Sequence, residues 1–186
     1  RRRHTRYISV TGVQTCALPI SLSLTLNTLL TRTAAVNRLG WIRTSEVKRL
    51  ANELISAFNV KAGGTEAVAK SLSGGNLQKF IVGREIDAAP KLLIVSQPTW
   101  GVDVGAAAQI RGALIALRNA GCAVLVVSEE LDELFEISDR LVVIARGKLS
   151  PSIPTEQATI ETIGEWMSGL WPQAQAQQEE ASHVAA

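Results

Sequence analysis

Two short apolar segments separated by a helical pattern constrain the fold of this 186-residue chain most strongly. KLLIVS at 91–96 and AVLVVS at 123–128 have the length and the β-branched content of buried strands. The segment between them, 104–121, has apolar residues at helical spacing and stops at Gly121. Apolar strands that alternate with helices indicate a parallel sheet with both faces covered, built from right-handed crossovers. The sequence therefore predicts an α/β fold.

The chain after the second strand predicts smaller elements. We expect a helix at 130–138 and a third strand of the sheet at 141–145. The tight turn at 146–148 allows this strand to pair antiparallel with a short strand near Leu149. A small helix at 159–167 then precedes a tail rich in Gln, Ala and Glu, which we expect to be disordered.

The region before the first strand is predicted to be helical. Leucines recur at helical spacing in 22–30, and a stronger amphipathic pattern spans 45–58. A third helix is expected from Asn76 to about residue 88, before Pro90. The patterns divide the chain into a leader at 1–20, a helical part at 21–89, an α/β core at 90–150, and a helix with a tail at 151–186.

The first twenty residues differ in composition from the rest. They contain four Arg and no Lys, Asp or Glu, and without them the chain has 15 basic and 17 acidic residues. Such a head is also compatible with a nucleic-acid arm or a transit peptide. However, VTGVQTCALPI at 10–20 resembles the translation of a common sequencing adapter. We therefore expect 1–20 to be non-native and the chain to be a fragment whose natural frame enters near Ser21.

Membrane spans and metal or disulfide frameworks are not indicated. The longest apolar runs have four or five residues, whereas a membrane helix needs roughly 18. Cys16 and Cys122 lie far apart and form no CxxC or Cys/His spacing. A reducing, cytoplasmic setting is the default expectation.

The segment SLSGGNLQK at 71–79 has the residue types of an anion-binding helix start. Gly74 and Gly75 allow the backbone to approach a ligand closely, and the Ser73 hydroxyl adds a donor. A helix from Asn76 offers unpaired N–H groups and the positive end of its dipole. This combination fits phosphate, and a plain helix cap is the alternative interpretation.

Three motifs, in order and spacing, resemble those of the ATP-binding subunits of ABC transporters: SLSGGNLQK, KLLIVSQPTWGVD at 91–103, and VLVVSEELDE at 124–133. Over about 21–169 the chain is similar to the C-terminal cassette of the fused, two-cassette ATPases of simple-sugar and nucleoside importers. The resemblance implies a P-loop NTPase-like ABC cassette of which only the back half is present. It would consist of a helical signature subdomain and a parallel-sheet core.

The resemblance implies that the LSGG signature acts on ATP held by a facing cassette. Ser73, Gly74 and Gly75 would bind this ATP in trans, with Gln78 nearby. Asp103 matches the family's D-loop at the interface between cassettes, and capping of the next helix is its alternative role. ATP and Mg²⁺ are therefore the expected cofactors, bound mainly by the partner cassette.

At the positions that perform ATP hydrolysis in a competent cassette of the family, this sequence has different residue types. Ser96 stands where the family has the Asp that holds Mg²⁺, so no metal ligand is expected there. Gln97 stands at the position of the catalytic Glu and cannot take a proton from water. Glu129 stands where the family usually has a switch His, and a carboxylate would repel the γ-phosphate. We expect this cassette's own site to be inactive.

The phosphate loop GxxxxGK[ST] is not found in the sequence. Gly64, Lys70 and Ser71 have its spacing, but Ala69 replaces the second glycine and a polar loop precedes the stretch. The enzyme class implied by the resemblance is an ATP hydrolase of the ABC type, and we expect this chain alone to be inactive.

The sequence therefore predicts a degenerate cassette of a sugar or nucleoside importer that completes its partner's ATP site and couples hydrolysis to transport. The expected partners are a second cassette, integral permease subunits and a periplasmic or lipoprotein substrate-binding protein, at the cytoplasmic face of a bacterial inner membrane. One alternative is a truncated, non-catalytic scaffold. Another is a DNA-repair or chromosome-type ABC ATPase, but the acidic balance after residue 20 disfavours a nucleic-acid partner.

Overall fold

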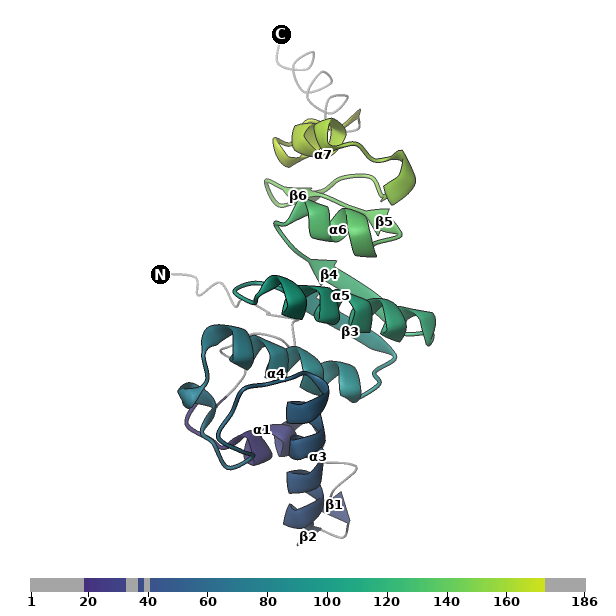
Figure 1. The fold of residues 1–186 in the computed structure, drawn as a ribbon. Coiled ribbons are helices and arrows are strands. Elements are labelled where there is room, and N and C mark those ends of the chain that lie inside the picture. The colour runs from purple at the N-terminus through teal and green to yellow at the C-terminus, as the bar shows by residue number, and fades with distance from the viewer. Residues whose placement is uncertain (1–18, 33–36, 39–40, 173–186) are drawn as a thin grey trace, which may run out of the picture. The chain divides into compact units, whose positions relative to one another are not determined.

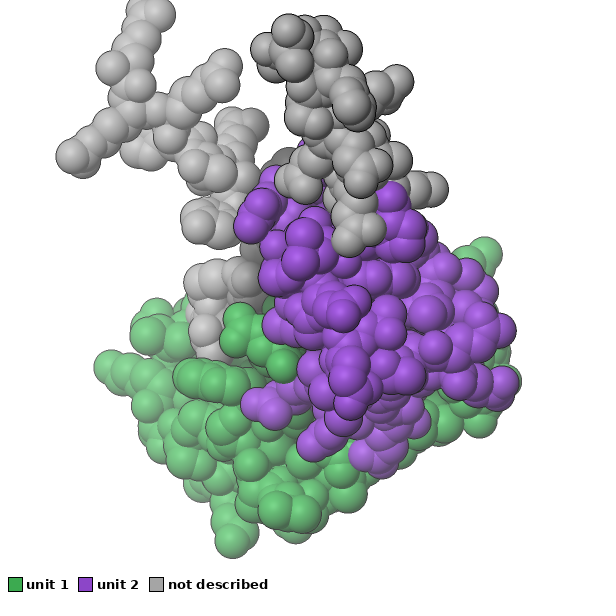
Figure 2. Space-filling model, turned by 90° about the horizontal axis from the view of Figure 1, so that it is seen from above, with its two compact units in different colours: residues 1–129 green, residues 130–186 purple. Residues whose placement is uncertain are grey.

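The computed structural model describes residues 19–32, 37–38 and 41–172 (Figure 1). The chain divides into two compact units, 1–129 and 130–186, which are coloured separately in Figure 2. The boundaries predicted after residues 89 and 150 were placed from sequence motifs, whereas the two units are defined by their compactness. The predicted boundaries therefore stay predictions. The expected disordered tail and nearly all of the adapter-like leader fall outside the described residues.

The helices of the first unit are α1 (Leu24–Thr31), α3 (Thr44–Ala57), α4 (Gly74–Asp87) and α5 (Val104–Asn119), with a short 3-10 helix at Ala69–Ser71. All four helices were expected from the hydrophobic pattern. The helix predicted from Asn76 begins two residues earlier, at Gly74, because the side chain of Ser73 caps it. A short antiparallel hairpin, β1 (Asn37–Arg38) with β2 (Trp41–Ile42), precedes α3.

The two predicted apolar strands pair in parallel, as the sequence indicates. In β3 (Leu92–Ser96) and β4 (Ala123–Val127), Leu92 lies opposite Ala123 and Ser96 opposite Val127. Helix α5 connects the strands and contacts β4, which makes a βαβ unit. The carboxyl ends of both strands therefore lie at the same edge of the sheet.

The two faces of this sheet differ in burial. Leu93 and Val95 face inward and are 5% and 0% exposed. The opposite face, called the outer face here, consists of Leu92, Ile94, Ser96, Ala123, Leu125 and Val127. Leu92 and Leu125 on this face are 58% and 53% exposed. Within the described residues, the outer face of the sheet is therefore covered only in part.

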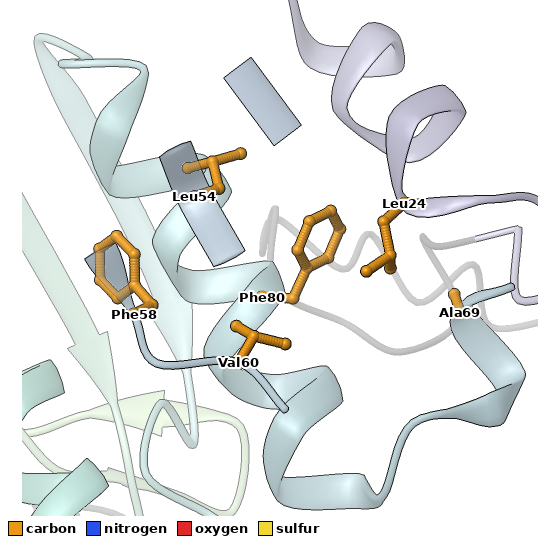
Figure 3. Close-up of a cluster of buried hydrophobic side chains, with 6 residues drawn as sticks. All are labelled: Leu24, Leu54, Phe58, Val60, Ala69 and Phe80. Carbon is orange, nitrogen blue, oxygen red and sulfur yellow. The ribbon is translucent and has the colours of Figure 1, made fainter. Parts of the chain in front are cut away.

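The core of the helical region is a cluster of apolar side chains, shown in Figure 3. Its members come from α1, α3, α4 and the loops between them: Leu24, Leu54, Phe58, Val60, Ala69 and Phe80. Phe80 of α4 and Leu24 of α1 are both completely buried. A Cβ on Gly83 would collide with the Phe58 ring, so α4 needs glycine there to pack closely. This packing fixes the position of α4.

The second unit corrects the prediction of a third strand at 141–145. Its elements are α6 (Leu131–Ile137), β5 (Arg140–Leu141), β6 (Ile144–Ala145), β7 (Lys148–Leu149), β8 (Ile153–Pro154), a 3-10 helix at Thr155–Gln157, and α7 (Ile160–Met167). β5 pairs antiparallel with β8, and β6 pairs antiparallel with β7. The segment is therefore interrupted at 142–143, and its two strands pair with β7 and β8 in two-stranded ribbons.

The burial pattern gives the physical reason for this difference. Leu141, Val143 and Ala145 are buried, whereas Val142 and Ile144 are about half or more exposed. A strand that alternates in this way has one covered face, which an antiparallel ribbon requires and a central parallel strand does not. The predicted hairpin with Leu149 is confirmed, and Arg146 and Gly147 at its turn both have positive φ.

Replacement of Phe80 by Ala is expected to lower the free energy of unfolding of the first unit by about 3–5 kcal/mol. The reason is that Phe80 is completely buried in the cluster of Figure 3, so its loss leaves a cavity. Leu30→Ala is the control, because Leu30 is 50% exposed, and a loss below about 1 kcal/mol is expected. Urea titrations followed by circular dichroism measure both, and equal losses would contradict this account of the core.

Candidate functional site

The signature segment 71–79 forms the start of α4, with Ser73 as its N-cap. The Ser73 Oγ accepts hydrogen bonds from the Asn76 backbone N–H at 3.4 Å and from Asn76 Nδ2 at 2.9 Å. Ser73 and Gly74 are exposed. The N–H groups of the first helical turn have no acceptor within the helix, so this end carries the positive end of the dipole. The alternative role of Ser73 as a helix cap is thus present in the structure, and its hydroxyl proton stays available for another acceptor.

Gly75 lies directly against the loop that follows β3. A Cβ placed on residue 75 would be 2.9 Å from the carbonyl oxygen of Gly101 and 3.5 Å from Val102 Cα. A Cβ on Gly74 would meet nothing within 4 Å. The two glycines of the signature therefore have different roles, since residue 75 is limited by the neighbouring backbone and residue 74 faces open space.

Gln78 joins the same helix to the same loop by hydrogen bonds. Its Nε2 donates to the carbonyl oxygens of Gln97 at 3.0 Å and Pro98 at 3.2 Å, and the side chain is buried. This amide nitrogen therefore holds the loop in place. The expected position of Gln78 near a nucleotide stays a prediction.

Asp103 caps α5 and also faces α4. Its Oδ1 accepts from the Ala106 backbone N–H at 2.9 Å, and its Oδ2 lies 3.5 Å from Lys79 Nζ. The hydrogen bond from Ala106 lowers the pKa of Asp103 below its ordinary value, and the positive charge of Lys79 adds to this effect. The capping role is therefore present, and the D-loop role stays a prediction.

Lys79 was missed by the sequence analysis. Its side chain is 11% exposed, which is unusual for lysine, and it forms an ion pair with Asp103. The usable signal was that Val82 and Ile86, three and seven residues after Lys79, make the side of the helix opposite Phe80 apolar as well.

The residues predicted at the degenerate hydrolysis site meet at the edge where β3 and β4 end. Ser96 ends β3, and the next residue, Gln97, has a left-handed backbone with φ 50°. The Gln97 N–H donates to the Val127 carbonyl at 2.7 Å, and its Oε1 accepts from Ser128 Oγ at 3.4 Å. Glu129 follows and is exposed. The structure therefore brings these positions together, as the two parallel strands require.

This edge has few groups that could hold Mg²⁺ or activate water. Ser96 and Gln97 are neutral, and the Gln97 amide oxygen already accepts from Ser128. The described residues contain no cluster of three His, Cys, Asp or Glu able to hold a metal ion. A divalent cation prefers carboxylate oxygens, so the donor set on β3 does not fit Mg²⁺.

In the stretch 64–71, which has the spacing of a phosphate loop, the N–H groups of the last three residues are engaged. Ala69 donates to Leu22 at 3.0 Å, Lys70 to Ile20 at 2.8 Å, and Ser71 to Val68 at 2.8 Å. A phosphate cradle needs free backbone N–H groups. This geometry agrees with the interpretation of the stretch as a linker.

Comparison with known proteins identifies relatives of the chain. No family model matches. The nucleoside import ATP-binding protein NupA of Lactococcus lactis subsp. cremoris is 45% identical over 134 residues, which are 72% of this chain and 26% of NupA. The guanosine import ATP-binding protein NupO of Bacillus subtilis is 43% identical over 70% of this chain and 26% of NupO. The ribose import ATP-binding protein RbsA 2 of Rhizobium meliloti is 32% identical over 89% of this chain and 32% of its own length.

Solved structures share the fold. The ATP-binding cassette MJ0796, in a dimeric post-hydrolysis state bound to ADP and Pi, matches with a TM-score of 0.65 at 20% identity. The match covers 76% of this chain and 60% of that one. A second dimeric structure of MJ0796, described as a bacterial ABC transporter cassette, has a TM-score of 0.65 at 19% identity over 77% and 61% of the two chains.

The fold is that of an α/β ABC ATPase cassette, present in part. The chain is a homologue of the ABC-type ATP-binding proteins of sugar and nucleoside import, and it spans about a quarter to a third of the length of these relatives. The predicted family and fold class are therefore confirmed.

Gly75→Ala is expected to destabilise the first unit by about 1–3 kcal/mol, because the added methyl group collides with the Gly101 carbonyl. Gly74→Ala is the matched control, since it adds the same atom to open space, and a change within about 0.5 kcal/mol is expected. Denaturant unfolding measures the difference, and hydrogen exchange should show faster opening at 101–106 in Gly75→Ala only. Similar effects of the two variants would rule out the steric contact.

Asp103 is expected to make the free energy of unfolding depend on pH in the acidic range. Its pKa is lower in the folded than in the unfolded chain, so its contribution is complete above the ordinary pKa and is lost as pH falls through the folded value. The loss should occur below about pH 4. Asp103→Asn should flatten this decline, because Asn still caps α5 but has no charge.

The pH prediction is measured as Tm between about pH 2 and pH 6, a range that includes the ordinary carboxyl pKa. Glu129→Gln is the control, since it neutralises an exposed carboxylate of the same unit. An acid decline that is unchanged in Asp103→Asn would contradict the assignment.

Proposed function

We propose that this chain acts as the degenerate cassette of an ABC importer ATPase, and that its signature segment completes an ATP site carried by a facing cassette. The main support is the asymmetry of the structure. The start of α4 is exposed and firmly held, while the edge at Ser96 and Gln97 has no carboxylate on its strand. A chain of this kind can contribute to hydrolysis without performing it at its own site.

The start of α4 supplies the chemistry that a phosphate needs. The N–H groups of Gly74 and Gly75 lie at the positive end of the helix dipole, and Ser73 has a hydroxyl proton to donate. Bound ATP with Mg²⁺ would supply the phosphoryl group and the metal charge. The residues of this chain would bind the phosphate oxygens and exclude water from that side.

The contacts between α4 and the loop after β3 would couple the phosphate-binding start of α4 to that loop. Gln78 holds the loop at Gln97 and Pro98, and Lys79 pairs with Asp103. A shift of Asp103 at a cassette interface would therefore be transmitted to the signature segment. We assign Asp103 a coupling role on these contacts.

This cassette's own site is proposed to be inactive in hydrolysis. Gln97 could orient a water molecule but has no carboxylate to accept its proton. Ser96 supplies no negative charge to a metal ion. Glu129 at the neighbouring strand end would repel a γ-phosphate. The residues at this edge therefore favour a structural role over catalysis.

The transported substrate is proposed to be a nucleoside or a simple sugar. The relatives are named for import of nucleosides, guanosine and ribose. We accordingly propose integral permease subunits and a periplasmic or lipoprotein substrate-binding protein as partners, at the cytoplasmic face of a bacterial inner membrane. The described part of the chain has no helix long and apolar enough to cross a bilayer.

The test uses NupA of L. lactis in which the aligned region is replaced by that of this chain. Gly74→Asp should lower ATP turnover by about a hundredfold or more, because the new carboxylate would lie at the proposed phosphate-binding start of α4 and repel the phosphate. Gly74→Ala is the control and should retain most turnover, since the added methyl group meets open space. Steady-state phosphate release measures both. Equal turnover in Gly74→Asp and the parent would contradict the proposal.

A second variant tests whether the edge after β3 is inactive. Gln97→Glu restores one carboxylate but leaves Ser96 neutral, so phosphate release should not rise. A clear rise would show that the site is catalytically competent. If the parent chimera assembles but hydrolyses no ATP, and Gly74→Asp changes nothing, the scaffold alternative is favoured.

A further inference from the structure

Asn76, in the first turn of α4, connects the signature serine to a loop that lies fifteen residues earlier in the chain. Its Nδ2 donates to Ser73 Oγ at 2.9 Å, and its backbone N–H donates to the same oxygen at 3.4 Å. Its Oδ1 accepts from the Lys61 backbone N–H at 2.8 Å. One side-chain amide therefore bonds to both the loop and the serine.

The Lys61 N–H fixes which way round this amide lies. A backbone N–H can only donate, so the atom of Asn76 that faces it must be the oxygen. The amide nitrogen, which can only donate, then faces Ser73. The direction of the hydrogen bond between the two side chains is thus set by the loop backbone, and Ser73 Oγ has to act as the acceptor.

The packing of the helical core holds both ends of this connection. Val60, directly before Lys61, is 5% exposed and belongs to the buried cluster of Figure 3. Phe80, about one helical turn after Asn76, is completely buried in the same cluster. Because close packing fixes both apolar side chains, the Lys61 N–H and Asn76 Oδ1 are kept within hydrogen-bonding distance.

The Ser73 hydroxyl has its acceptor capacity used at the start of the helix. A serine hydroxyl has two lone pairs and one proton. The two hydrogen bonds from Asn76 engage both lone pairs, so the proton is the group that this side chain has left to offer. Since Ser73 is exposed, the proton can bond to an acceptor that arrives from outside the chain.

We propose that Asn76 is a positioning residue, which fixes the Ser73 hydroxyl as a hydrogen-bond donor to the phosphate of ATP held by a facing cassette. This inference rests on the proposed function and adds how the serine is oriented before ATP binds. Asn76 acts through Ser73 and need not touch the nucleotide. Without the amide, the hydroxyl is free to rotate and to accept from water, so part of its orientation has to be restored on binding.

The experiment measures KM for ATP and kcat by steady-state phosphate release in the NupA chimera described above. Asn76→Ala and Ser73→Ala should each raise KM about tenfold and change kcat less than about threefold, because each weakens a hydrogen bond to bound phosphate. The double variant should also raise KM about tenfold, and not about a hundredfold, since Asn76 acts only through the hydroxyl. A loss of folded protein would instead lower kcat at unchanged KM.

Gln109→Ala is the matched control. Gln109 also joins two segments by a side-chain amide, since its Nε2 donates to the Ala57 carbonyl at 2.7 Å. It makes this bond away from Ser73, so KM should stay at the value of the parent chimera. Asn76→Asp is a second test variant, because it retains an acceptor for the Lys61 N–H but has no side-chain N–H to donate to Ser73. KM should rise at least as much as in Asn76→Ala.

The outcomes separate this inference from the proposed function. If Ser73→Ala raises KM but Asn76→Ala or Asn76→Asp does not, the positioning role is wrong and the proposed function stands. Effects that multiply in the double variant, or an equal rise of KM in Gln109→Ala, would overturn the positioning role in the same way. If Ser73→Ala and Gly74→Asp both leave the kinetics unchanged, the proposed function fails, and this inference fails with it.

Discussion

The close contact between α4 and the loop after β3 is the constraint on which the rest of the first unit depends. Three successive features make it: the absence of a side chain at Gly75, the hydrogen bonds from Gln78, and the ion pair of Lys79 with Asp103. They join a helical segment to a sheet segment that the sequence separates. The signature segment is therefore held by the same loop that leads into α5.

This contact also bears on the proposed inactivity of the edge at Ser96 and Gln97. Gln97 accepts from Gln78 through its carbonyl and from Ser128 through its side chain. Both oxygens of Gln97 are thus engaged within the fold, where a catalytic carboxylate would have to face a water molecule. Under the proposed function, Gln97 would hold the loop next to the signature segment and would not take part in catalysis.

Much of the fold could be predicted from local patterns. The βαβ unit and the helices of the first unit follow from apolar periodicity and from caps such as Ser73 and Asp103. The segment 141–145 was assigned wrongly. The residue types of a short apolar segment do not distinguish a strand with one covered face from a strand with two. Only the partners of Leu141 and Ile144 in space decide between the two.

The sequence by itself determined the family, since the order and spacing of the three motifs are visible in the amino-acid sequence. It also determined which catalytic residue types are absent from the end of β3. Only the tertiary structure decided that Gly75 abuts Gly101, that Lys79 is buried beside Asp103, and that Leu92 and Leu125 are more than half exposed among the described residues. The physical reason is that close approach and burial depend on residues distant in the chain, whereas periodicity and capping depend on neighbours.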